Sequence, residues 1–268
     1  MSGSRLPVLG KSIASNLGVS ATTLGLFVLA LITSLPELSI TLAALLRERA
    51  PDLALGNVLG SNNFNLTTIA FLDAAFAGGA FLGAVHAPRY GRTCRLLLLL
   101  TAIVGAGVIV GGLFGTTLVP VLLFSVPIVL VFVLEAAPGT VPLDEEEDEG
   151  EEPPFASTGS LAVRFALLSA IVIAAGFFMS QAANGIALYP FDVGGRSVVL
   201  GQTFVGSLLV AIATSLPEVT VAAAAVTRAR SADIALGTLL GSNAINIVLF
   251  AVGAPLLALT AGRSAWQS

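Results

Sequence analysis

The chain has 268 residues, of which 56% are hydrophobic and only 10% are charged, and its mean hydropathy is +0.96. Soluble domains carry about 25% charged residues, so this composition predicts a protein that lies in lipid. A single cysteine, Cys94, excludes an internal disulfide and a cysteine-based metal site. No charged n-region with a short apolar core and cleavage site opens the chain, so we expect no removable signal peptide.

Apolar stretches of about 20 residues, the length that crosses about 30 Å of hydrocarbon, occur seven times along the chain. The third and fourth are separated at Gly115-Thr116-Thr117, because the uncharged interval around this point is too long for one crossing. The predicted spans are Thr22–Leu46, Leu53–Phe76, Leu96–Phe114, Thr117–Leu134, Leu161–Leu188, Ser197–Thr227 and Ile234–Leu259. We therefore expect an all-α membrane protein with about seven transmembrane helices.

A run of acidic residues from Asp144 to Glu152, flanked by prolines, interrupts the apolar pattern. This composition is typical of a solvated linker. A calcium-sensing loop is the alternative, but the run lacks the glycine-kinked ligand spacing of such loops. The sequence predicts a first membrane half at 1–135, an acidic loop at 136–160 and a second membrane half at 161–268.

The two halves contain copies of one motif, and every matching pair is separated by 181 residues. Thr33-Ser34-Leu35-Pro36-Glu37 recurs as Thr214-Ser215-Leu216-Pro217-Glu218. The match continues from Asp52, Ala54, Leu55, Gly56, Leu59, Gly60, Ser61, Asn62 and Asn65 to Asp233, Ala235, Leu236, Gly237, Leu240, Gly241, Ser242, Asn243 and Asn246. A constant offset over a 33-residue block predicts two repeats with the same three-dimensional shape.

The repeats are expected to be inverted, because Glu37 lies in the first predicted span and Glu218 in the sixth. Five crossings separate the two residues, and an odd number turns the second copy upside down. Inverted repeats are typical of secondary transporters, whose substrate site lies near the membrane midplane where the repeats meet. Transport is therefore the leading functional hypothesis.

A glutamate inside an apolar helix costs about 2.5–3.5 kcal/mol on insertion scales, so both acids require compensation. Protons or bound cations could supply it. Thr33 and Ser34 precede Glu37 by four and three residues and share its helix face, as do the equivalent hydroxyls with Glu218. Pro36 and Pro217 lack a backbone N–H, so we expect a broken helix with displaced carbonyls beside each acid.

The second helix of each repeat adds hydroxyl and amide oxygens on one face. Ser61 and Asn65 are four residues apart, as are Ser242 and Asn246. Glycines in the same helices predict close approach to a partner. Oxygen donors without paired His or Cys favour hard cations such as Na⁺ and Ca²⁺ over zinc or copper.

The doubled Thr-Ser-Leu-Pro-Glu and Gly-Ser-Asn-x-x-Asn motifs resemble the α-repeats of the cation/calcium exchanger superfamily, specifically its sodium/calcium exchanger branch. The resemblance covers Ala30 to Asn65 and Ala211 to Asn246. It implies an antiporter that exchanges Ca²⁺ for Na⁺ by alternating access, without a cofactor, and seven helices that correspond to the family's second to eighth. It also implies metal ligands at Glu37, Glu218, Thr33, Thr214, Ser34, Ser215, Ser61, Ser242, Asn65, Asn246, Ala30 and Ala211, with the two alanines acting through their carbonyls.

The chain departs from the family pattern at Asn246, where many relatives have an aspartate; the loss of that charge bears on sodium stoichiometry. Glycine is also usual in the family at Ile32 and Ala213. By resemblance the acidic loop is cytoplasmic in a multi-pass plasma-membrane protein, which places eight basic residues inside and four outside, in keeping with the positive-inside rule.

Two other functions stay open at the level of the sequence. The first is a proton-coupled cation exchanger, and the second is a degenerate ion-binding membrane protein that does not transport. An enzyme is not expected, because the chain has no Ser/His or Cys/His pair and no phosphate loop. No basic patch indicates nucleic acid as a partner. Asp52 and Asp233 are interpreted as acids that cap helices, and Asp73 is left unassigned.

Overall fold

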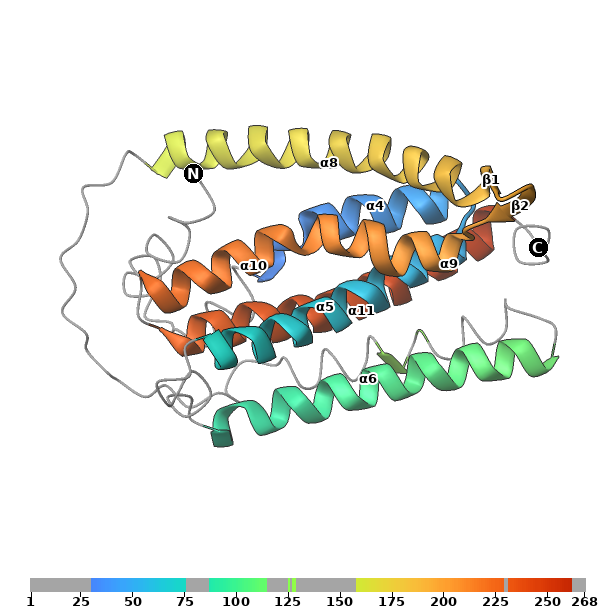
Figure 1. Ribbon diagram of the computed structural model, residues 1–268. Coiled ribbons are helices and arrows are strands. Elements are labelled where there is room, and N and C mark those ends of the chain that lie inside the picture. The colour runs from blue at the N-terminus through green and yellow to red at the C-terminus, as the bar shows by residue number, and fades with distance from the viewer. Residues whose placement is uncertain are drawn as a thin grey trace.

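A computed structural model describes residues 30–75, 87–114, 125, 127–128, 158–228 and 231–261. These residues form a mostly helical bundle (Figure 1). Its helices are α3 (Ala30–Thr33), α4 (Leu35–Leu46), α5 (Pro51–Ala75), α6 (Ala87–Phe114), α8 (Thr158–Leu188), α9 (Gln202–Phe204), the π-helical η3 (Val205–Val210), α10 (Ala211–Thr227) and α11 (Ala232–Ala261).

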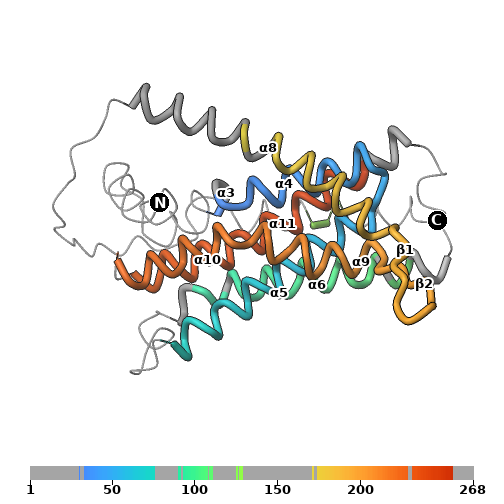
Figure 2. Tube along the Cα trace, turned by 45° about the horizontal axis from the view of Figure 1, so that its top comes forward, coloured from blue at the N-terminus to red at the C-terminus, as the bar shows by residue number. Residues whose placement is uncertain are grey.

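The centre of the bundle is formed by α5 and α11, which pack against each other and against α4 and α10. Helix α8 covers α4, while α6 packs against α11. Figure 1 shows α8 and α6 on opposite sides of this central group, and Figure 2 shows α8 alongside α4. The residues of both repeats therefore occupy the interior, and the helices outside the repeats surround them.

Corresponding helices of the two repeats run in opposite directions. The colours of Figure 1 show α4 and α11 running from left to right, whereas α5 and α10 run from right to left. Helix α4 of the first repeat is thus antiparallel to α10 of the second, and α5 is antiparallel to α11. This arrangement is the one expected of an inverted pair of repeats.

Most predicted spans coincide with helices, with shifted ends. Helix α11 begins at Ala232 and α8 at Thr158, both before the predicted starts, because polar residues extend each helix past its apolar stretch. Among the described residues, two helical stretches are long and apolar enough to cross a membrane, namely Gln202–Thr227 and Ala232–Pro255. The predicted fourth span has only three described residues, and the acidic loop is almost wholly outside the described part of the chain.

A β-hairpin between α8 and α9 shows that the all-α prediction is wrong at one point. Strand β1 (Pro190–Val193) pairs antiparallel with β2 (Arg196–Val199). Gly194 and Gly195 make the turn with positive φ angles of 62° and 79°, and the Gly195 N–H donates to Asp192 Oδ1 over 2.8 Å. A two-residue turn with two positive φ angles suits a hairpin. The sixth predicted span counted the apolar residues of β2 as helix, because hydropathy alone does not distinguish the two.

The two prolines beside the glutamates have different effects on their helices. In the first repeat the helix is interrupted at Ser34, between α3 and α4, and Pro36 lies in the first turn of α4. In the second repeat α10 continues through Pro217, and the irregular segment is η3, which ends just before Ala211. The predicted break is therefore present in the first repeat and absent at Pro217 in the second, where the irregular segment η3 lies upstream of α10.

Glycines bring α5 into backbone contact with η3. A Cβ atom placed on Gly56 would lie 2.8 Å from the carbonyl oxygen of Thr203, and one on Gly206 would lie 2.5 Å from that of Leu53. Contacts this short are not tolerated between real side chains and backbone. The predicted close approach is therefore present in the first repeat, and it brings the polar face of α5 against the start of α10.

Candidate cation site

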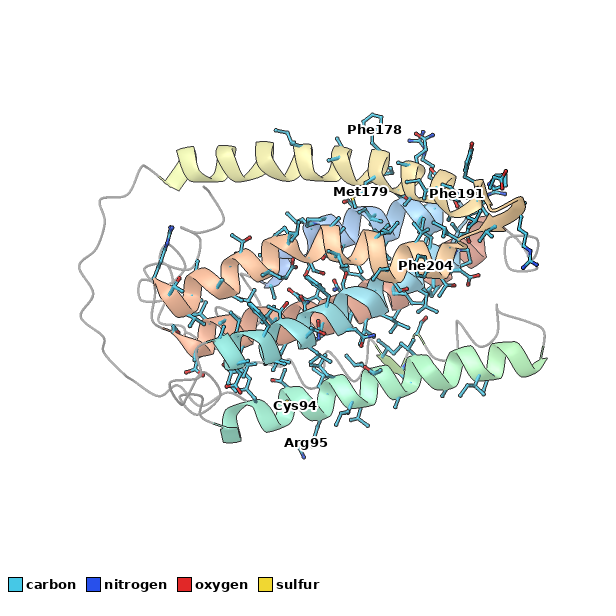
Figure 3. All side chains as sticks on the ribbon, in the orientation of Figure 1. Cys94, Arg95, Phe178, Met179, Phe191 and Phe204 are labelled. Carbon is cyan, nitrogen blue, oxygen red and sulfur yellow. The ribbon has the colours of Figure 1, made fainter. Side chains whose placement is uncertain are left out.

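The two repeated glutamates lie inside the bundle, from opposite repeats. Glu37 is in the first turn of α4 and Glu218 is in the middle of α10, and their side chains are 1% and 0% exposed. The two helices that carry them, α4 and α10, contact each other. Figure 3 shows oxygen-bearing side chains gathered between these central helices. The structure therefore brings together the two acids that the sequence singled out.

Each glutamate is hydrogen-bonded by a serine of the other repeat. Ser215 donates to Glu37 Oε1 over 3.2 Å, and Ser34 donates to Glu218 Oε1 over 3.4 Å. Ser242 adds a 3.3 Å hydrogen bond to the same Glu218 oxygen. The sequence predicted that hydroxyls on a glutamate's own helix would surround it. The structure exchanges these serines between the repeats, because antiparallel α4 and α10 face one another.

The remaining predicted hydroxyls join the repeats in the same reciprocal way. Thr33 Oγ1 lies 3.4 Å from Ser242 Oγ, and Thr214 Oγ1 lies 3.4 Å from Ser61 Oγ. Each pair links the first helix of one repeat to the second helix of the other. All four side chains are buried. The hydroxyl groups thus form a layer that is nearly two-fold symmetric around the carboxylates.

One oxygen of each glutamate has no hydrogen-bond partner among the described residues. These atoms are Glu37 Oε2 and Glu218 Oε2, and the same holds for Asn65 Oδ1 and Asn246 Oδ1. A buried acceptor without a partner costs about 1–3 kcal/mol, so four of them in symmetric positions demand an explanation. All four belong to the set of ligands implied by the family resemblance.

The carbonyls of Ala30 and Ala211 lie at the edge of the cluster and accept hydrogen bonds from it. Thr33 Oγ1 donates to the Ala30 oxygen over 3.3 Å, and Thr214 Oγ1 donates to the Ala211 oxygen over 3.2 Å. The backbone N–H of Ser34 also donates to Ala30 over 2.9 Å. Both carbonyls therefore adjoin the site, but the protein's own hydroxyls use them in this conformation.

Several polar residues of the cluster were not assigned a role from the sequence. Asn57 Nδ2 donates a hydrogen bond to the Thr41 hydroxyl over 3.2 Å, and its Oδ1 lies 3.4 Å from the Thr214 hydroxyl, which extends the network on one side only. The corresponding position of the second repeat is Thr238, whose hydroxyl bonds to the backbone of its own helix. The constant offset identified repeated residues but passed over Asn57, because that position is not repeated.

Asp233 and Asp52 lie in the first turns of α11 and α5, away from the glutamates. Asp233 Oδ1 accepts a hydrogen bond from the Tyr90 hydroxyl over 3.1 Å. The hydroxyl that caps α11 belongs to Ser231, which accepts from the Ile234 N–H over 3.2 Å. The capping residue of α11 is therefore Ser231 rather than Asp233, and both aspartates lie in a first turn, where the helix dipole favours an acid.

The chemistry of the site is that of oxygen alone. Within the described ranges no group of three or more His, Cys, Asp or Glu residues comes together. Two carboxylates, surrounded by hydroxyls and primary amides, match the ligands preferred by hard cations with flexible coordination. A cation placed between the unpartnered oxygens would also relieve the repulsion between the two acids.

Comparisons with known proteins agree with this geometry. The family described as sodium/calcium exchanger protein matches residues 6–136 and 160–266. Inner membrane protein YrbG of Escherichia coli (strain K12) is 31% identical over 272 residues, covering 96% of this chain and 75% of that protein. Membrane protein MJ0091 of Methanocaldococcus jannaschii is 27% identical over 246 residues, covering 91% of this chain and 74% of that protein.

A solved structure of the sodium-calcium exchanger NCX_Mj, soaked with Na⁺ and Sr²⁺, superposes with a TM-score of 0.59. The two chains are 25% identical, and the match covers 95% of this chain and 77% of that one. Opposed helical repeats that enclose buried acids define the class of secondary ion transporters. Within that class, the chain belongs to the sodium/calcium exchanger protein family. It is thus a membrane protein and a cation exchanger of the antiporter type.

Proposed function

We propose that the protein exchanges Ca²⁺ for Na⁺ across a membrane by alternating access around the buried cluster. Glu37 and Glu218 are the central ligands. They are assisted by the hydroxyls of Thr33, Thr214, Ser34, Ser215, Ser61 and Ser242, the amide oxygens of Asn65 and Asn246, and the carbonyls of Ala30 and Ala211. The site lies in a plasma membrane, with the acidic loop on its cytoplasmic side.

The observation that supports this function is the symmetric set of four buried oxygens without hydrogen-bond partners. Two are carboxylate oxygens and two are amide oxygens, and each repeat contributes one of each kind. A proton on a glutamate would satisfy one carboxylate oxygen, but it would leave both amide oxygens unpaired. A cation satisfies all four at once, which favours cation binding over protonation alone.

The charge of the site explains why transport takes the form of exchange. Two carboxylates balance one Ca²⁺ or two Na⁺, so either load leaves the interior close to neutral. An empty site would carry two buried like charges through the conformational change, and buried unpaired charges are strongly unfavourable. The protein therefore moves its site between the two sides of the membrane only when it is loaded.

The test is uptake of radioactive Ca²⁺ into proteoliposomes that hold the purified protein and an outward Na⁺ gradient. We expect uptake by the wild type and its loss in Glu37→Gln and in Glu218→Gln, since each substitution removes one of two essential charges. Glu48→Gln is the matched control. Glu48 lies just after α4, where it pairs with exposed Arg47 over 3.7 Å.

The same vesicles distinguish the alternatives. Uptake driven by a proton gradient but not by Na⁺ would replace Na⁺ by H⁺ as the coupling ion. Absence of uptake in the wild type under both gradients would refute transport and support a degenerate protein. Undiminished uptake in both glutamine variants would refute the ligand assignment.

A further inference from the structure

The centre of the bundle holds four asparagines whose amides are joined in a crossed pattern. Asn62 and Asn65 lie on α5, and Asn243 and Asn246 lie on α11. All four side chains are buried. Asn65 and Asn246 belong to the proposed ligand set, whereas Asn62 and Asn243 do not.

The first pair holds the two helices together through the backbone. Asn62 Nδ2 donates to the Asn243 carbonyl over 3.1 Å, and Asn243 Nδ2 donates to the Asn62 carbonyl over 3.3 Å. A backbone carbonyl only accepts hydrogen bonds, so the amide group that faces it must be the NH₂. The orientation of both amides is therefore decided by the main chain, and their oxygens point the other way.

These oxygens in turn orient the second pair. Asn65 Nδ2 donates to Asn243 Oδ1 over 2.9 Å, and Asn246 Nδ2 donates to Asn62 Oδ1 over 3.4 Å. Each ligand asparagine thus uses its NH₂ on an asparagine of the other repeat. Its own Oδ1 is left buried and without a partner among the described residues.

A primary amide presents either an acceptor or a donor, and only the acceptor binds a cation. If Asn65 or Asn246 were free to rotate, its NH₂ could turn toward the ion and repel it. The crossed hydrogen bonds remove this option, because a rotated amide would place its oxygen against another oxygen. The network therefore preorganises the cation site before any ion arrives.

We propose that Asn62 and Asn243 are positioning residues, which hold the amides of Asn246 and Asn65 with their oxygens directed at the transported cation. The proposal rests on the proposed function, since it requires a cation in the site. It adds that each repeat orients the amide ligand of the other. Loss of Asn62 should weaken the ligand at 246 on the opposite helix, and not the ligand at 65 on its own helix.

Isothermal titration of Ca²⁺ into the purified full-length protein tests this pairing through double substitutions. We expect Asn62→Ala and Asn246→Ala each to raise the Kd for Ca²⁺, and the double variant to bind about as weakly as the weaker single one. In the double variant Asn62→Ala with Asn65→Ala, the increase in Kd should equal the product of the two single increases, because the two substitutions affect different ligands. For Asn62→Ala with Asn246→Ala, the increase in Kd should be smaller than the product of the two single increases by about fivefold or more.

Asn63→Ala is the matched control, since Asn63 lies on the same helix with an exposed side chain. Its Kd should equal that of the wild type. The mirror set of Asn243→Ala with Asn65→Ala or Asn246→Ala repeats the test with Asn62 intact. Serine at positions 62 and 243 gives a second set of variants if the alanine proteins do not fold.

Three outcomes would overturn the proposal. In the first, Asn62→Ala and Asn243→Ala leave the Kd unchanged. In the second, the increase in Kd equals the product of the single increases for both double variants, as a purely structural role predicts. If Glu218→Gln still abolishes binding in either case, the proposed function stands and only the positioning role fails. In the third, the wild type binds no Ca²⁺, and both proposals fail together.

Discussion

Substitution of Gly60 by alanine tests whether the backbone contact between α5 and η3 builds the site. A Cβ atom at this position would lie 2.6 Å from Cα of Ser207 and 2.7 Å from Cβ of Ala211, whereas ordinary contacts are 3.4–4 Å. The nearest obstacles include main-chain atoms, which no rotamer change can move aside. The two helices must therefore separate by most of an ångström, directly beside the Ser61–Thr214 contact.

The expected magnitude follows from two opposing effects. Overpacking of a well-packed interior costs about 1–3 kcal/mol. Alanine in place of glycine inside a helix recovers about 0.8–1 kcal/mol. Because the obstruction is largely backbone, we expect Gly60→Ala to lower the free energy of unfolding by about 1–2 kcal/mol and to raise the Kd for Ca²⁺.

Gly185→Ala is the control with the opposite expected sign. Gly185 lies in α8, and a Cβ atom there would meet nothing within 4 Å. This variant should gain up to about 1 kcal/mol of stability from helix propensity alone and leave Ca²⁺ binding unchanged. The comparison is made by unfolding both variants in mixed detergent and monitoring the loss of helix by circular dichroism. A Gly60→Ala protein as stable as Gly185→Ala would refute the reasoning.

Substitutions at three further positions have defined expectations. Tyr90→Phe removes the hydrogen bonds to Asp233 and should cost about 1–2 kcal/mol of unfolding free energy without changing Ca²⁺ affinity. Ser180→Ala removes a buried hydroxyl that has no partner within the described part of the chain, so its melting temperature should stay the same or rise. Asn57→Leu leaves two buried hydroxyls without their amide partner, so it should lower the free energy of unfolding by about 1–3 kcal/mol and weaken Ca²⁺ binding. Asn57→Thr introduces the residue found at the corresponding position of the other repeat, so it should retain more stability and more Ca²⁺ affinity than Asn57→Leu.

The repeats, their inversion and the two glutamates could be predicted from the sequence because each depends on a local pattern that occurs twice. A constant offset needs no knowledge of how the copies pack. Hydropathy likewise located most of the described helices, since burial in lipid and burial in protein both select apolar residues. It failed at the hairpin, because the apolar residues at the end of β2 are followed after only Leu200 and Gly201 by the helix that begins at Gln202.

The crossed contacts could not be predicted in the same way. Which serine reaches Glu37 depends on the relative placement of α4 and α10, and that placement is a property of the whole bundle. Reading each repeat separately assigned Ser34 to Glu37, whereas the structure gives that role to Ser215. The asymmetric residue Asn57 was missed for the complementary reason, because a search for repetition does not detect a difference.

The exchange of hydrogen bonds between repeats has a consequence for the origin of the protein. Neither half contains the whole candidate site, because Glu37, Glu218, Asn65 and Asn246 each form a hydrogen bond with a side chain of the other repeat. An ancestral gene that encoded one half could assemble the same cage only if its product entered the bilayer in both orientations and formed an antiparallel, two-fold symmetric dimer. Gene duplication and fusion would then have joined covalently two chains that already had to associate to form the site.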